Sequence, residues 1–82
     1  MASGEVGTSK FTWGDTVKVL FSAGGHYRPG AIGSVCGMRA IADAQGQSQF
    51  GEAMGSMVYT IEFDDGTSLE VPERLLEGLE RA

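Results

Sequence analysis

The chain has 82 residues with 41% hydrophobic residues, a formal net charge of −5, 13 glycines and one cysteine. This length supports one domain with a small core, a single cysteine excludes an internal disulfide, and the acidic balance disfavours non-specific binding to nucleic acid. The sequence has neither an apolar secretory leader at its start nor a stretch long enough to span a membrane, so we expect a soluble cytoplasmic protein.

Residues 1–10 are small, polar and aperiodic, which predicts a flexible tail before a domain that spans residues 11–82. Thr16–Phe21 alternates apolar and polar side chains and predicts the first strand. The next segment, Ser22–Ala31, contains the turn dipeptides Gly-Gly and Pro-Gly and is expected to be a loop.

The segment Ile32–Ile41 predicts a second strand, in which Gly33 and Gly37 indicate a bulge or tight coiling. Residues 42–56 are polar, are punctuated by glycine and contain one aromatic residue, Phe50. We expect them to form a second long loop, which in a compact domain is mobile or functional.

A hairpin follows, and its apolar pattern determines the turn. A three-residue turn at residues 64–66 places Ile61 opposite Leu69 and Tyr59 opposite Val71, so that apolar side chains share a face. The pattern therefore predicts a type I turn that ends with Gly66 in the left-handed region.

After Pro72 the apolar period changes, which predicts a short helical turn whose leucines close one end of the domain, with a last short strand at Leu79–Ala82. The predicted fold is all-β, a small barrel of about five strands with a short helical turn near the C-terminus. Closing the sheet on itself would remove most of its exposed edges.

The segments "WGDTVKVL", "HYRPGAIGSV" and "VYTIEFDDG…LEVPERLLE" resemble the SH3-like barrels of electron-transport accessory proteins. That group includes the E subunit of photosystem I, the variable chain of ferredoxin–thioredoxin reductase, the C-terminal domain of the nitrile hydratase β subunit and the type II dihydrofolate reductases. The resemblance covers roughly residues 11–80 and implies an SH3-like barrel.

The nitrile hydratase side of the resemblance implies an accessory role and a partner surface. The type II reductases carry a pore-lining Gln and Tyr, and their positions fall on Leu69 and Val71 of this chain. Neither polar group is present, and Glu70 places a negative charge where NADPH would approach. Such a reductase, an oligomer that binds NADPH and folate in a central pore, is therefore the alternative and not the main prediction.

His26, Tyr27 and Arg28 are adjacent in the first long loop. Tyrosine and arginine are typical of binding hot spots, so these residues could anchor a partner. The alternative is that Tyr27 covers the end of the barrel while Arg28 pairs with an acid. The sequence does not decide between them.

Phe50 and Met54 in the second long loop offer adaptable apolar area, so we expect a ligand or partner to dock on the two long loops and not on the acidic turn. Trp13 is a further candidate for the binding surface, although a plug of the barrel end is the favoured interpretation.

Nothing in the sequence predicts catalysis, a metal or a cofactor. Cys36 has no neighbouring base, which favours a structural thiol, and His26 has no second ligand nearby. The acidic side chains near the hairpin are expected to form a solvated face; they are Glu62, Asp64, Asp65, Glu70 and Glu73.

We therefore predict a non-enzymatic binding or accessory module that contacts an unidentified protein or small ligand, with nucleic acid and membrane disfavoured. A small core also favours a homo-oligomer, most simply a homodimer. A second alternative is an acidic immunity or antitoxin-type inhibitor of a basic partner, which the acidic residues 57–82 would suit.

Overall fold

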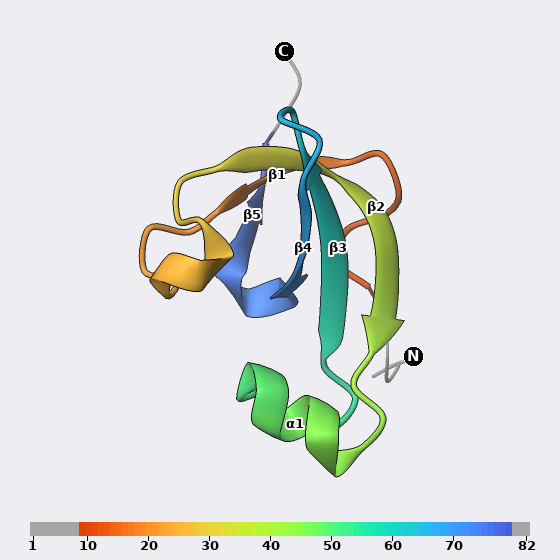
Figure 1. The fold of residues 1–82 in the computed structure, drawn as a ribbon. Coiled ribbons are helices and arrows are strands. Elements are labelled where there is room, and N and C mark those ends of the chain that lie inside the picture. The colour runs from red at the N-terminus through yellow and green to blue at the C-terminus, as the bar shows by residue number, and fades with distance from the viewer. Residues whose placement is uncertain (1–8, 80–82) are drawn as a thin grey trace.

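The computed structural model describes residues 9–79, which form one antiparallel sheet, a short helix and two 3-10 turns (Figure 1). The strand order is β4-β3-β2-β1-β5. The elements, in chain order, are β1 (Thr16–Val19), η1 (Gly25–Tyr27), β2 (Ile32–Ala40), α1 (Ala44–Phe50), β3 (Met57–Phe63), β4 (Ser68–Pro72), η2 (Glu73–Leu75) and β5 (Leu76–Gly78). The all-β class, the five strands and the helical turn near the C-terminus are confirmed.

The sheet is not closed into a barrel, so the predicted closure is wrong. β4 and β5 are the two edges of the sheet, and each pairs with one neighbour only, β3 and β1 respectively. Pro72 is the last residue of β4, and after it the chain turns into η2. β5 then pairs with β1 instead of meeting β4.

The core lies on the concave face of the curved sheet, where the strands contribute alternate side chains. Val17 and Val19 of β1 are fully buried, as are Ile61 of β3 and Val71 of β4. Burying each such aliphatic side chain contributes roughly 1.5–3 kcal/mol, so these alternating positions explain why the strands form.

The hairpin between β3 and β4 has the predicted register. Ile61 lies opposite Leu69 and Tyr59 opposite Val71. Gly66 has a φ of 87°, and its N–H donates to the Phe63 carbonyl at 3.0 Å. The three-residue turn is therefore confirmed, with glycine at the left-handed position.

β2 is the longest strand, and its glycines allow it to curve. The register with β3 shifts between Val35 and Gly37, so Cys36 lies exposed at a bulge. A Cβ at Gly33 would come within 2.5 Å of the Glu62 carbonyl oxygen. The predicted bulge and tight coiling thus correspond to one bulge and one close approach between neighbouring strands.

Residues 42–56 were predicted to form a loop throughout, but α1 occupies their centre. Asp43 caps this helix, since its Oδ1 accepts a hydrogen bond from the Gly46 N–H at 2.8 Å. Gly51 ends the helix in the left-handed conformation, with a φ of 67°. Within residues 9–79, no helix combines the length and apolar character needed to cross a membrane.

Two other predicted boundaries differ from the structure. β1 ends at Val19, and Phe21, which was expected to belong to this strand, is exposed in the following turn. The last strand begins directly after η2, at Leu76, whereas the strand predicted at Leu79–Ala82 lies outside the described residues except for Leu79. Most of the predicted tail, residues 1–10, also lies outside them.

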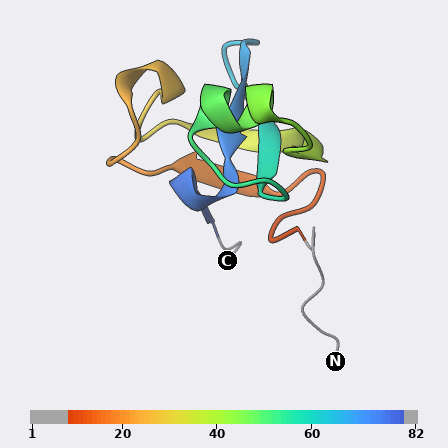
Figure 2. The same ribbon diagram turned by 90° about the horizontal axis from the view of Figure 1, so that it is seen from below.

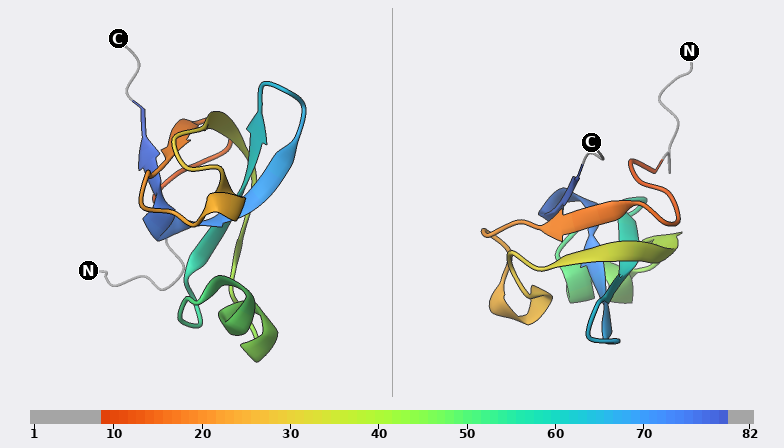
Figure 3. Two further views of the ribbon diagram at one scale, coloured as in Figure 1. Left: turned by 60° about the vertical axis from the view of Figure 1, so that its left-hand side comes forward. Right: turned by 90° about the horizontal axis from the view of Figure 1, so that it is seen from above.

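The connections that follow β1 and β2 project to the same side of the molecule. Figures 2 and 3 show η1, α1 and the β3–β4 hairpin on one side, with β1 and β5 on the other. This arrangement brings two segments that are far apart in the sequence close to β4, an edge of the sheet.

Candidate functional site: a pocket beside the edge strand

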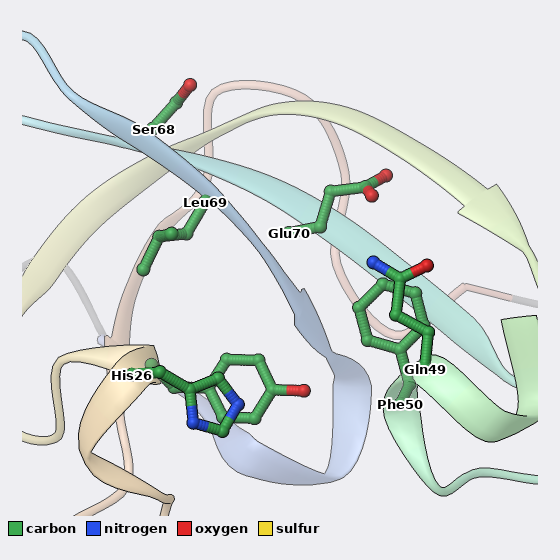
Figure 4. Close-up of a pocket in the computed structure, with 7 residues that line it drawn as sticks. His26, Gln49, Phe50, Ser68, Leu69 and Glu70 are labelled. Carbon is green, nitrogen blue, oxygen red and sulfur yellow. The ribbon is translucent and has the colours of Figure 1, made fainter.

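A pocket of about 310 Å³ lies between η1, the end of α1 and β4 (Figure 4). Each of the three elements contributes two or three consecutive residues to its wall. The lining residues are His26, Tyr27, Gln49, Phe50, Ser68, Leu69 and Glu70. The volume is at the lower end of the range for small-ligand sites.

The first wall is η1, in which a sharp turn presents two aromatic rings. Arg28 ends this turn in the left-handed conformation, with a φ of 60°. Tyr27 is 9% exposed, and the His26 ring lies 4.0 Å from it, centroid to centroid. Burial, followed by the nearby charge of Glu52, raises the pKa of Tyr27. Tyr27 is therefore a neutral, partly apolar wall at physiological pH.

The second wall is the last turn of α1. Phe50 is 7% exposed and joins the hydrophobic core, while Gln49 beside it is exposed at the pocket. The Arg39 guanidinium lies 5.7 Å from the centre of the Phe50 ring. The helix thus supplies one fixed aromatic ring and one adaptable amide.

The third wall is β4. Leu69 is half-buried against the core, and its side chain points toward His26, whereas Ser68 and Glu70 point the other way (Figure 4). Glu70 accepts two hydrogen bonds from Arg39, at 2.7 and 3.0 Å. This bidentate contact lowers the pKa of Glu70, so its carboxylate is ionised and already paired.

Two further arginines tie the walls to neighbouring elements. Arg28 donates a hydrogen bond to Thr67 Oγ1 at 2.7 Å and lies 3.3 Å from an Asp65 carboxylate oxygen, which joins η1 to the hairpin. Arg74 of η2 pairs with Glu52, just beyond α1. Both contacts cross between elements, so they organise the pocket before any ligand arrives.

The structure brings together three of the six residues predicted for a binding surface: His26, Tyr27 and Phe50 all line the pocket. Met54 is 52% exposed and does not line it. Trp13 is 69% exposed and also lies outside the pocket lining, so the favoured interpretation of it as a plug is wrong. It precedes β1 in a turn and not at the centre of the fold.

The sequence left open whether Tyr27 and Arg28 anchor a partner or whether Tyr27 covers the end of the barrel while Arg28 pairs with an acid. Their contacts in the structure match the second alternative. Tyr27 is buried and Arg28 pairs with Asp65. Burial and pocket lining are nevertheless compatible for Tyr27, because one side of its ring faces the core while the rest borders the pocket. Arg28 is next to the pocket, but its charge is committed to the hairpin.

Sequence reasoning missed Gln49 and the β4 residues that complete the pocket. The hairpin register already placed Leu69 on the core face, near the start of an edge strand. What the register could not show is that the two long connections fold toward this edge. That depends on contacts between segments far apart in the chain, such as Arg28 with Thr67.

The acidic side chains near the hairpin were expected to form a solvated face; Glu62, Asp64 and Asp65 are exposed, whereas Glu70 and Glu73 are half-buried. Asp65 pairs with Arg28, Glu70 pairs with Arg39, and Glu73 accepts a hydrogen bond from Tyr59. Glu62 remains exposed on the outer face, opposite Ser68. Within residues 9–79, no three histidine, cysteine or acidic side chains gather as metal ligands.

The positions that the resemblance aligns with the reductase pore have different environments here. Val71 is 0% exposed inside the core, whereas Leu69 borders the pocket. A second hollow, of about 470 Å³, lies on the outer face of β1, β2 and β3 and contains none of the six predicted site residues; its lining residues are Thr16, Ile32, Gly33, Ser34, Glu62, Phe63 and Asp64.

No protein-family model, curated protein or solved structure matches the chain.

Proposed function

We propose that this chain is a non-enzymatic, SH3-like binding module, and that it holds a protein segment or small ligand in the pocket between η1, α1 and β4. The observation that carries the proposal is the convergence of His26 and Tyr27 with Phe50. These residues come from two connections about two dozen positions apart, and they meet at one edge of the sheet.

The chemistry of the pocket supports binding more than catalysis. Tyr27 has a raised pKa and keeps its proton at neutral pH, while Glu70 has a lowered pKa and remains an ionised, paired carboxylate. A general acid or base works best when its pKa is near the working pH. Two fixed aromatic rings with polar groups at the rim are typical of a recognition site.

The order of the elements supports the SH3-like assignment. Two long connections follow β1 and β2, a tight turn joins β3 to β4, and a 3-10 turn leads to the last strand. The sequence predicted this order of strands and connections for a small SH3-like barrel. An accessory role fits a module that has a pre-organised binding pocket and whose charged side chains at the pocket are paired.

A matched pair of substitutions on α1 tests the placement of the binding surface. Gln49→Arg adds a long charged side chain at the pocket, whereas Ser48→Arg adds it one residue away, outside the pocket lining. Interacting proteins captured from the native host and identified by mass spectrometry should be lost with Gln49→Arg and kept with Ser48→Arg. Equal capture by both variants, with both folded, would place binding elsewhere.

A further inference from the structure

The free edge of β4 presents backbone groups to the pocket. The Phe63 N–H donates to the Thr67 carbonyl at 2.8 Å, and in an antiparallel ladder such hydrogen-bonded pairs alternate with non-bonded ones. Leu69 and Val71 therefore bond to β3, whereas the N–H and C=O groups of Ser68 and Glu70 face away from it. No turn or loop hydrogen bond among residues 9–79 reaches these outward groups.

The free edge of β4 is bounded by a specific residue at each end. At its start, Arg28 holds Thr67. At its end, Pro72 has no N–H to offer, a common protection of edge strands. The other edge strand, β5, spans only three residues, Leu76–Gly78, and so offers a shorter edge. The open stretch is thus the short segment that also lines the pocket.

We infer that the pocket takes an extended, uncharged peptide segment of a protein partner, which pairs as a short strand with Ser68–Glu70. This inference rests on the proposed function and specifies its ligand. The partner residue opposite Leu69 has its side chain on the same face as Leu69, and Leu69 points toward His26, which lines the same pocket (Figure 4). One apolar side chain of the peptide therefore enters the pocket between Tyr27 and Phe50.

The charged side chains around the pocket are already paired, which favours an uncharged peptide segment. The acids around the pocket are each paired with an arginine: Asp65 with Arg28, Glu70 with Arg39, and Glu52 with Arg74. A charged peptide residue would lose hydration without gaining a free partner there. A neutral backbone and an apolar side chain match what the rim and the pocket offer.

A second copy of the chain fits this edge less well. Antiparallel self-pairing around Leu69 would set Glu70 opposite Ser68 and make the two Glu70 carboxylates diagonal neighbours on one face, in a protein whose net charge is already −5. Each copy would also offer outward donors at two positions only, and pairing over so short a stretch would bury much less area than a stable dimer does. The homo-oligomer predicted from the sequence remains a prediction for other surfaces.

The test uses a binder selected from a library of uncharged, acetylated and amidated hexapeptides, against the full chain. Ser68→Pro removes one outward N–H and no bond to β3, as Pro72 already does at the equivalent position. Ser68→Ala is the matched control, because it removes the hydroxyl and keeps the N–H. We expect Ser68→Pro to weaken binding roughly tenfold, the effect of one backbone hydrogen bond, and Ser68→Ala to leave it unchanged.

Methylation of the peptide backbone gives an independent measurement that does not depend on the folding of Ser68→Pro. Strand pairing predicts that N-methyl groups at alternate positions, those facing β4, abolish binding, while those at the positions between them are tolerated. The amide protons of Ser68 and Glu70 should also gain protection from hydrogen exchange in the complex. Binding that ignores both the methylation pattern and Ser68→Pro would overturn strand pairing.

The remaining outcomes separate this inference from the proposed function. A peptide that shifts the NMR signals of Tyr27 and Phe50, but whose binding shows no alternating effect of N-methylation, supports the pocket and refutes the added strand. Protection of Ser68 and Glu70 that rises with protein concentration alone identifies a second copy as the occupant and refutes the peptide. Selected peptides that bind only away from Tyr27 and Phe50 refute both the inference and the proposed site.

Discussion

The Tyr59 hydroxyl donates a 2.6 Å hydrogen bond to the Glu73 carboxylate, and this contact fixes the start of the domain to its core. The same hydroxyl accepts from the backbone N–H groups of Lys10 and Phe11, at 2.9 and 3.1 Å. Glu73 also accepts from Lys10 N–H at 2.8 Å. β3, η2 and the segment before β1 therefore meet at one buried tyrosine.

Tyr59→Phe should destabilise the fold by about 1–3 kcal/mol, because it leaves a carboxylate and backbone N–H groups without their shared partner. Tyr27→Phe is the matched control, since the Tyr27 hydroxyl makes no hydrogen bond within residues 9–79, and it should change stability by less than about 0.5 kcal/mol. Urea unfolding measures both. Equal stabilities for the two variants would show that the network contributes nothing.

The register of the β3–β4 hairpin leads to a second prediction. Gly66 has a φ of 87°, a conformation that a side chain disfavours, so Gly66→Ala should cost on the order of 1 kcal/mol. Gly25→Ala is the control, because a Cβ there meets nothing within 4 Å and the backbone is not left-handed. A thermal melt in which the two variants behave alike would contradict the turn assignment.

Alternation was enough to predict the sheet, because strand patterning depends on neighbours in the sequence. The hairpin is the clearest case: the apolar pairs Ile61–Leu69 and Tyr59–Val71 allowed only one turn length. Closure was not predictable in this way. It depends on where the chain turns after Pro72, and local periodicity does not specify which edges then meet.

α1 was missed because its sequence has weak helix propensity, with Gly46 and Ser48 in its interior. The signals that mark it are its ends: Asp43 as the N-cap and Gly51 as the left-handed stop. Together these two signals indicate a helix of about two turns. The candidate site depended on that helix, since Phe50 reaches the pocket from its last turn.

The carboxyl group of Asp65 yields a prediction about pH. Hydrogen bonds from the Thr67 hydroxyl and then the Thr67 N–H, together with Arg28, lower the pKa of Asp65 from 3.8 to about 2. Because the folded pKa is depressed, the stabilisation is complete above pH 3.8 and is lost as the pH falls toward about 2. Thr67→Val should raise this pKa, although the backbone donor remains.

NMR titration of the Asp65 side chain measures the pKa directly. Thr60→Val serves as the control, because it changes a threonine of the neighbouring strand that does not contact Asp65. The stability difference between wild type and Thr67→Val should shrink when unfolding is measured below pH 3.8. An Asp65 pKa that is the same in wild type and Thr67→Val would rule out the hydroxyl as its main cause.

The last prediction concerns the helical wall of the pocket. Asp43 supplies the N-cap of a helix with only seven residues, and such a short helix has little stability of its own. Asp43→Ala should cost about 1 kcal/mol and expose the amides of α1 to faster hydrogen exchange, while those of β2 and β3 keep their protection. Asp64→Ala, in the exposed hairpin turn, should leave α1 unchanged. Because Gln49 and Phe50 form one side of the pocket, any ligand held there should bind Asp43→Ala more weakly than Asp64→Ala. If Asp43→Ala has frayed α1 amides but unchanged ligand affinity, α1 is not part of the binding site.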